Sequence, residues 1–372
     1  MHILIAPDKF KGSLSAPEAA GAIARGFREV WPDAILDLAP IADGGEGFAE
    51  ALAVALGATW IRIPGADALG GRIEARYAWH DAEKLAVIEM SEASGLWRIA
   101  PEARDPLRAD TFGTGLLLAD AIARGARRIL VGLGGSATTD GGVGMARARG
   151  YRFLDGTGKE YTPLPGTLES LGRIERPAVL RLPRIIAACD VQNPLLGERG
   201  TARVYSPQKG ANPAAVEILE RAMQRLAEVC SASLGKDCRD VPGAGAAGGL
   251  GFGLLTFCDA TIRPGFDIVA ETVNLPARIA SADLVVTGEG RLDHQTLEGK
   301  GPAGVAALAR KLHKPVIGFG GSVTEEAERA GLFDRLIPIA EPSLPLADAM
   351  RDAAILLEGA SLRTARSIRE GR

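Results

Sequence analysis

The chain has 372 residues and a formal net charge of −3, with 47% hydrophobic and 24% charged side chains. It is longer than a chain that usually folds around a single hydrophobic core, so two domains are expected. The charge balance argues against non-specific nucleic-acid binding, and no apolar stretch reaches the ~20 residues that span a bilayer. Four scattered cysteines without CxxC spacing argue against a disulfide framework or a zinc site, and favour a cytoplasmic protein with reduced thiols.

The beginning of the chain alternates strands and helices. Apolar runs at 2–6 and 35–39 predict short buried strands. Ser15 followed by Glu18 is typical of a helix N-terminus, and this helix is expected to run to about residue 30. The other elements expected in this part are a helix at 45–56 and a strand at 58–63.

The pattern changes near residue 66. Two strands at 72–79 and 84–90, joined by a short polar turn, predict an antiparallel pair. The elements expected after them are a helix at 111–124, a strand at 127–133, an irregular segment at 151–180, a strand at 184–188 and a helix at 213–233.

From about residue 265 the first pattern returns. The expected elements are helices at 268–280, 302–312, 325–330 and 346–369, and strands at 284–287, 315–319 and 335–339. The sequence therefore predicts an α/β fold. We expect a discontinuous Rossmann-like domain with a doubly wound parallel sheet, formed by 1–65 and 265–372, and an inserted α/β domain at 66–264. Ligands of such sheets bind at the carboxyl ends of strands, which favours a site in an inter-domain cleft.

The segment 131–146, VGLGGSATTDGGVGMA, is the strongest chemical signal, because a glycine-rich loop follows an apolar strand directly. Glycine lets backbone N–H groups approach an anion closely, and hydroxyl groups add further donors. A lone carboxylate in the loop could hold a metal ion or accept a proton. The residues predicted to bind a phosphate-bearing cofactor here are Gly134, Gly135, Ser136, Thr138 and Asp140.

A second glycine-rich segment, at 243–251, matches the dinucleotide fingerprint by letter. The residues before it are polar, so no strand leads into it, and the match is weak support for NAD. A phosphate loop or a close-packed hinge is favoured. Gly245, Gly248 and Gly249 are the predicted cofactor-binding residues of this segment.

Two polar segments follow the first two strands. In PDKFKGS, the cations Lys9 and Lys11 with the hydroxyl of Ser13 suit a substrate carboxylate or phosphate, although a solvated turn is the alternative. In IADGGEG, Asp43 and Glu46 suit a metal ion, although they would also form a simple helix cap.

Three later segments carry further candidates. Asp190 ends a strand and suits a general base or a Mg²⁺ ligand, while Lys209 suits a group that contacts a transferring phosphoryl. A turn with a surface charge is the alternative for both. In the segment 287–301, Arg291 suits an anion, and Glu289 or Asp293 suits Mg²⁺. The chain contains neither a GxxxxGKS/T phosphate loop nor the protein-kinase motifs.

Taken together, these segments resemble the type 1 glycerate kinase family, the bacterial glycerate 2-kinases. The matching segments run in order from about residue 4 to 322: APDKFKGSLSA, PIADGGEG, VGLGGSATTDGGVGMA, ACDVQNPLLGERGTA, SPQKGA, GAGAAGGLGFG and VTGEGRLDHQTLEGKGP. The resemblance implies ATP-dependent phosphorylation of D-glycerate, usually to 2-phosphoglycerate, by a two-domain α/β enzyme with Mg²⁺ as the companion of the nucleotide.

A mechanism consistent with these residues places the ATP phosphates on the two glycine-rich segments. Lys9 and Lys11, or Arg291, bind the glycerate carboxylate, and Asp190, with Asp293 as second choice, accepts the proton of the hydroxyl. Lys209 stabilises the transferring group, and the predicted metal ligands come from Asp43, Glu46, Asp190, Glu289 and Asp293.

The alternatives are a kinase forming 3-phosphoglycerate, a non-catalytic regulator that binds a nucleotide or sugar acid, and an NAD-linked oxidoreductase. No nucleic-acid or membrane partner is expected. The oligomeric state stays open, with a homodimer as one candidate.

Overall fold

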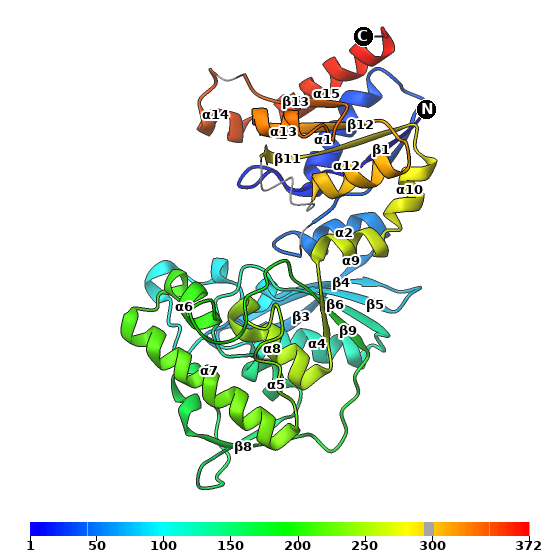
Figure 1. Cartoon of the computed structure of the whole chain (residues 1–372). Coiled ribbons are helices and arrows are strands. Elements are labelled where there is room, and N and C mark those ends of the chain that lie inside the picture. The colour runs from blue at the N-terminus through cyan, green and yellow to red at the C-terminus, as the bar shows by residue number, and fades with distance from the viewer. Residues whose placement is uncertain (43, 294–300, 342, 372) are drawn as a thin grey trace. The chain divides into compact units, whose positions relative to one another are not determined.

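The computed structural model describes residues 1–371 except 43, 294–300 and 342 (Figure 1). The chain is an α/β protein, which confirms the predicted fold class. It divides into two compact units: unit 1 comprises Met1–Asp43, Glu50–Gly57 and Phe266–Arg372, and unit 2 comprises Gly44–Ala49 and Ala58–Gly265. No helix in the described part of the chain is long and apolar enough to cross a membrane.

Unit 1 contains a five-stranded parallel sheet with the strand order β13-β12-β11-β1-β2. The order reverses between β1 and β11, because β2 lies on one side of β1 and the later strands lie on the other. Such a reversal is the switch point at which doubly wound sheets bind ligands. The strands are β1 (His2–Ile5), β2 (Ile35–Leu38), β11 (Leu284–Leu292), β12 (Val316–Val323) and β13 (Arg335–Pro338).

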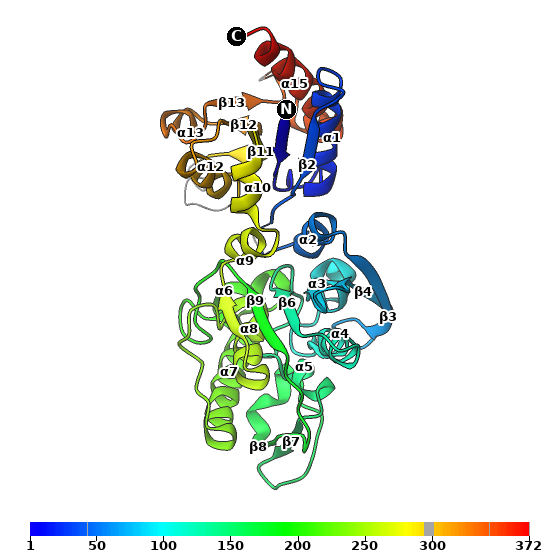
Figure 2. The same cartoon turned by 90° about the vertical axis from the view of Figure 1, so that its right-hand side faces the viewer.

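Helices cover both faces of this sheet. Helix α1 (Ala16–Arg28) packs against α15 (Ala353–Arg369), and α12 (Pro302–Lys311) packs against α10 (Leu275–Ser281). Figure 2 shows these two pairs on opposite sides of the sheet. The predicted helix start is confirmed, since Ser15 and Glu18 form a reciprocal capping box. Among the residues described, the other helices that include residues of this unit are α2 (Phe48–Leu56), α9 (Gly265–Thr272), α13 (Glu325–Arg329) and α14 (Leu346–Arg351).

Unit 2 contains a six-stranded sheet with the order β10-β9-β6-β5-β4-β3. The first four strands of this order run parallel, so their carboxyl ends share one edge, whereas β4 and β3 pair antiparallel. The strands are β3 (Thr59–Ala66), β4 (Arg72–His80), β5 (Leu85–Glu89), β6 (Arg128–Gly132), β9 (Arg184–Ala188) and β10 (Thr261–Arg263).

The core of unit 2 is a large hydrophobic cluster that includes Tyr77, Met145 and Phe257, with a small separate cluster around Ala68 and Ile99. Its helices are α3 (Ser91–Ser94), α4 (Phe112–Ala123), α5 (Val143–Ala148), α6 (Thr201–Tyr205), α7 (Pro213–Leu234) and α8 (Ala246–Cys258), and four short 3₁₀ turns accompany them at Leu96–Arg98, Pro101–Ala103, Pro165–Ser170 and Pro207–Lys209.

Four sequence predictions differ from the structure. The strand expected at 58–63 belongs to unit 2, because β3 pairs with β4. The segment expected to be irregular holds an antiparallel pair, β7 (Arg152–Asp155) and β8 (Leu171–Glu175). The helix expected at 268–280 is interrupted at Asn274, whose φ of 52° is left-handed, and the closing helix is interrupted at Asp352.

Candidate active site

The switch point of unit 1 brings the turn after β1 against strand β11. The N–H of Asp8 donates to the carbonyl oxygen of Gly288 at 2.8 Å, and a Cβ added to Gly290 would lie 3.1 Å from the nitrogen of Lys11. Residues 8–11 therefore lie beside 288–290. The structure thus gathers the predicted substrate-binding residues Lys9 and Lys11 near the predicted metal ligand Glu289.

Hydrogen bonds inside the turn present Lys11 to solvent. Phe10 pairs with Leu14, and the Ser13 hydroxyl donates to the carbonyl oxygen of Phe10 at 3.0 Å. Lys11 is exposed at the tip of this turn, and Lys9 is partly buried. Ser13, predicted to bind substrate, helps to close the turn.

Asp8 is a buried carboxylate that the sequence analysis did not select, although it also follows a strand. Its carboxylate accepts the N–H of Lys9 at 2.6 Å. Further along, Arg291 forms an ion pair with Asp293 at 2.9 Å, and 69% of the Arg291 side chain is exposed. Asp43, a predicted metal ligand, lies outside the described residues.

In unit 2, only the tip of the glycine-rich loop after β6 reaches the surface. Gly135 is exposed with a left-handed φ of 67°, and Gly134 is partly buried, whereas residues 136–140 are buried. The N–H of Leu96 donates to the carbonyl oxygen of Gly135 at 2.8 Å, and that of Ala137 donates to Ser94 at 2.9 Å. The tip is therefore fixed by backbone pairing and remains accessible to a ligand.

Lys209 holds this loop from inside. Its ammonium group donates to the Ser136 hydroxyl at 2.8 Å and to the carbonyl oxygen of Thr138 at 2.6 Å, and the residue is only 2% exposed. Burial lowers the pKa of Lys209 to about 7, although the charge of Asp140 raises it. Both of these hydrogen bonds go to the loop, and the predicted contact of Lys209 with a transferring phosphoryl group stays a prediction.

Asp140 organises the same loop. Its carboxylate accepts the N–H and the hydroxyl of Thr111 at 2.9 and 2.7 Å, and it accepts the N–H groups of Gly142 and Gly144 at 3.1 and 2.9 Å. The residue is 1% exposed. A carboxylate so fully occupied by N–H and hydroxyl donors shapes the loop.

Asp110 lies beside Asp140 and was not selected from the sequence. Its carboxylate accepts the N–H of Phe112 and pairs with Arg147, both at 2.9 Å. Burial and the neighbouring charge of Asp140 raise the pKa of Asp110 to about 6. This buried acid pair with its arginine belongs to the internal support of the glycine-rich loop.

The second glycine-rich segment packs against the first. A Cβ on Gly248, whose φ is 70°, would lie 1.7 Å from the carbonyl oxygen of Thr138, and one on Gly249 would lie 2.9 Å from the Cα of Gly141. A Cβ on Gly245 would lie 2.2 Å from the carbonyl oxygen of Pro194. These contacts favour the close-packed alternative, and residues 236–241 form no strand of a dinucleotide-binding unit.

The segment Gly44–Ala49 lies over the carboxyl ends of β6 and β9. A Cβ on Gly134 would lie 2.6 Å from the Cα of Gly45 and 3.1 Å from the nitrogen of Glu46. A Cβ on Gly44 would lie 3.0 Å from the backbone of Ala188. Glu46 is exposed, so the structure places a predicted metal ligand next to the accessible tip of the glycine-rich loop.

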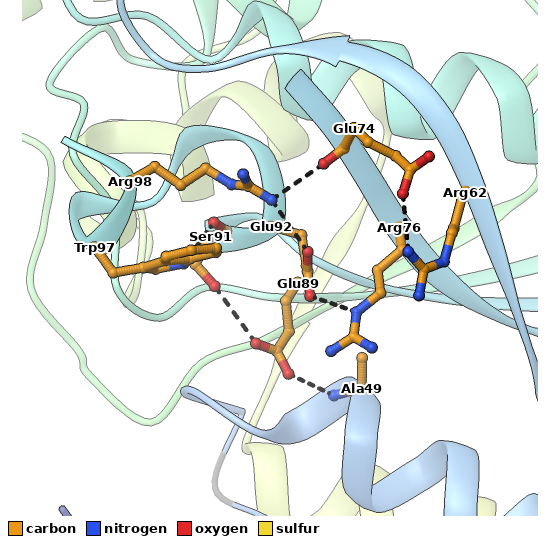
Figure 3. Close-up of polar contacts among 9 residues, drawn as sticks. All are labelled: Ala49, Arg62, Glu74, Arg76, Glu89, Ser91, Glu92, Trp97 and Arg98. Atoms are coloured by element: carbon orange, nitrogen blue, oxygen red, sulfur yellow. Dashed lines mark hydrogen bonds and ion pairs between the residues drawn. The ribbon is translucent and has the colours of Figure 1, made fainter. Parts of the chain in front are cut away.

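Two carboxylates stand at the same edge of the sheet. Asp190 follows β9 and accepts the N–H of Gly265 at 3.1 Å. Glu89 ends β5 and accepts the N–H of Ala49 at 2.8 Å and the Ser91 hydroxyl at 3.4 Å (Figure 3). Burial raises the pKa of Glu89 to about 7. Glu89 was not selected from the sequence, although a carboxylate directly after a run of apolar strand residues was the available signal.

The two units thus offer different chemistry at the carboxyl ends of their parallel strands. Unit 1 offers cations at its switch point, which suit an anionic ligand. Unit 2 offers the tip of a glycine-rich loop beside carboxylates, which suits phosphate with a cation. No group of three or more His, Cys, Asp or Glu residues forms a ready-made metal site among the residues that the structure describes. This fold and these loops define an α/β protein equipped to handle anions.

Comparison with known proteins specifies the class. The model of the glycerate kinase family matches residues 3–369. The chain is 44% identical to "Glycerate kinase" of Bacillus subtilis (strain 168), covering 99% of this chain and 97% of that protein. It is 45% identical to "Glycerate 2-kinase" of Escherichia coli (strain K12), covering 88% and 86% respectively.

A solved structure agrees with these relatives. A crystal structure provisionally assigned as glycerate kinase 2 from Salmonella typhimurium LT2 superposes with a TM-score of 0.90 at 42% identity, covering 100% of this chain and 99% of that one. The chain therefore belongs to the glycerate kinase family, as its motifs indicated, and it is an enzyme of the kinase class.

Proposed function

We propose that the protein transfers the terminal phosphoryl group of ATP to the C2 hydroxyl of D-glycerate, forming 2-phosphoglycerate. The observation that carries the proposal is the pair of anion-suited loops at the carboxyl ends of parallel strands in two sheets, in a chain of the glycerate kinase family. The family name supplies the substrate, and the name of the Escherichia coli relative favours the C2 position.

The donor phosphates are assigned to the accessible tip of the glycine-rich loop, Gly134–Ser136. Bound Mg²⁺ would neutralise phosphate charge there, and such ions are commonly held by one or two carboxylates together with substrate phosphates. Glu46 fits this requirement, because it is exposed and its backbone adjoins Gly134. Glu289 is the candidate in unit 1, and Asp43 remains a candidate from the sequence alone. Lys209 and Asp140 keep the loop in shape from inside.

The glycerate carboxylate is assigned to Lys9 and Lys11, supported by the exposure of Lys11 beside the unit 1 switch point. Asp190 is assigned as the base that accepts the proton of the attacking hydroxyl, with Asp293 as the second candidate. The ion pair between Asp293 and Arg291 favours Asp190, because the guanidinium already occupies the Asp293 carboxylate.

The test is a coupled ADP-release assay with D-glycerate, followed by phosphorus NMR of the product. We expect ATP-dependent turnover and the resonance of 2-phosphoglycerate. A 3-phosphoglycerate resonance would reject the C2 assignment. Nucleotide binding without turnover would instead support the non-catalytic regulator.

A thermal-shift experiment with NAD tests the remaining alternative. We expect no stabilisation, because the glycines of the 243–251 segment are taken up by packing contacts. Saturable stabilisation by NAD would reopen the oxidoreductase interpretation.

A further inference from the structure

We infer that Glu89 is a positioning residue of this enzyme, because its carboxylate fixes the Gly44–Ala49 segment against the glycine-rich loop. The inference rests on the proposed function, since this segment carries Glu46 and adjoins the tip assigned to the donor phosphates. None of the sequence segments that carry the resemblance to the family includes Glu89.

The geometry is that of a helix cap supplied from a distant part of the chain. The first N–H groups of a helix lack partners within the helix, and a side chain near in sequence commonly accepts them. Helix α2 begins at Phe48, and the N–H of Ala49 donates to Glu89, 40 residues further along the chain. The amide of Gly47 also interacts with this carboxylate and, like that of Ala49, lowers its pKa.

In the capped segment, the buried side chain of Phe48 lies against Gly132, whereas the three glycines before it offer no side chain for anchoring. The segment includes Gly44, Gly45 and Gly47, and a Cβ on Gly47 would meet no atom within 4 Å. Its contacts with Gly134 and Ala188 are close approaches of backbone to backbone or to small side chains. A buried carboxylate that accepts its amides is therefore well suited to hold the segment in register with the loop tip.

The residues around Glu89 leave its carboxylate hydrogen-bonded to these amides. The neighbouring carboxylate, Glu92, pairs with Arg76 at 2.9 Å and with Arg98 at 3.5 Å, as Figure 3 shows. These two arginines compensate the charge of Glu92. The carboxylate of Glu89 instead accepts hydrogen bonds from Ala49 and Ser91.

The test compares Glu89→Met, which keeps the side-chain volume but removes the acceptor, with Glu89→Gln, which keeps an acceptor oxygen. Glu74→Gln is the matched control, because Glu74 is an exposed residue of the same sheet that pairs with Arg62. Hydrogen exchange of the Gly47 and Ala49 amides is the first readout. We expect Glu89→Met to accelerate it roughly tenfold or more, and Glu89→Gln and Glu74→Gln to stay near the wild type.

Steady-state kinetics are the second readout. We expect Glu89→Met to raise the apparent KM for ATP·Mg²⁺ roughly tenfold with a smaller change in kcat, and Glu89→Gln to restore most of the loss. Unchanged amide exchange in Glu89→Met would overturn the inference. A Glu89→Gln variant with native amide exchange, but with kcat lowered as strongly as in Glu89→Met, would also overturn the inference. In that case the carboxylate would take part in the reaction itself.

The two proposals fail separately. A wild-type protein without glycerate-dependent turnover would reject the proposed function, whereas the exchange experiment would still decide whether Glu89 holds the segment.

Discussion

The turn after β1 in unit 1 and the loop after β6 in unit 2 look alike in sequence, since both are polar segments that follow an apolar strand. They differ in what their polar groups do. In unit 1, Asp8 and Ser13 hold the turn, but Lys11 stays exposed, as does most of Arg291 on the adjoining strand β11. In unit 2, Asp140 and Lys209 turn inward and hold the loop. The glycine-rich loop of unit 2 uses polar side chains to fix its own backbone. Polar residues in such a loop therefore indicate where a site lies more reliably than which atoms contact the ligand.

The largest expected effect is the loss of kcat on substitution of Asp190, which tests whether the general base lies in unit 2. Asp190→Asn should lower kcat by ~10²- to 10⁴-fold if its carboxylate is the base, because the amide cannot accept the proton. Asp293→Asn is the comparison in unit 1 and should lower kcat less. Steady-state rates measure both, and a reversed order of the two losses would move the base to unit 1.

Glycine substitutions test whether the second glycine-rich segment serves packing. Gly248→Ala should destabilise the protein by about 3 kcal/mol, because its φ is left-handed and the new methyl would collide with Thr138. Gly47→Ala shares the left-handed φ but has open space, so it should cost only about 1 kcal/mol. Urea unfolding measures the difference, and equal costs would contradict the packing assignment.

The buried ammonium of Lys209 makes stability depend on pH. Its pKa is about 7 in the folded protein against the ordinary 10.5, so the unfolded chain binds more protons between these values. Stability from this group should therefore rise with pH from 7 to 10.5, by at most about 1.4 kcal/mol per pH unit. Lys209→Met should remove that rise in denaturation curves measured across this range. An unchanged slope would show that the ammonium is not buried as described.

The smallest expected effect concerns the exposed cation of unit 1. Lys11→Ala should raise the KM for glycerate roughly tenfold with little change in kcat, because an exposed charge–carboxylate contact contributes modestly to binding. Lys84→Ala, on the surface of unit 2, is the control and should leave the KM unchanged. An equal KM in the Lys11 variant and the wild type would remove Lys11 from the substrate site.

Local sequence patterns were sufficient to predict most helices and strands of the fold. The capping box at Ser15 and the antiparallel pairing of β4 with β5 are confirmed. The interruption at Asn274 was not predictable, because the apolar periodicity continues through a residue whose backbone is left-handed. The β7–β8 pair was missed because its short strands lie far apart in a proline-rich segment.

The site was predictable by location but not by role. The rule that ligand groups follow parallel strands selected Lys9, Asp190 and the glycine-rich loop, and their contacts with a ligand stay predictions. Glu89 escaped it because β5 pairs antiparallel with β4 on one side and parallel with β6 on the other, and only the first pairing is evident from adjacent sequence. The inward direction of Lys209 depends on tertiary packing, which residue type does not reveal.

The central strand of unit 1 has a consequence for how the chain acquires its structure during synthesis. The Thr287 hydroxyl donates to the carbonyl oxygen of Ala6 across 281 residues, and β1 pairs with β11 beside it. The sheet of unit 2 is by contrast contributed by one continuous stretch of chain. On the ribosome we expect that stretch to fold first, while the amino-terminal strand waits for its central partner until most of the polypeptide has emerged.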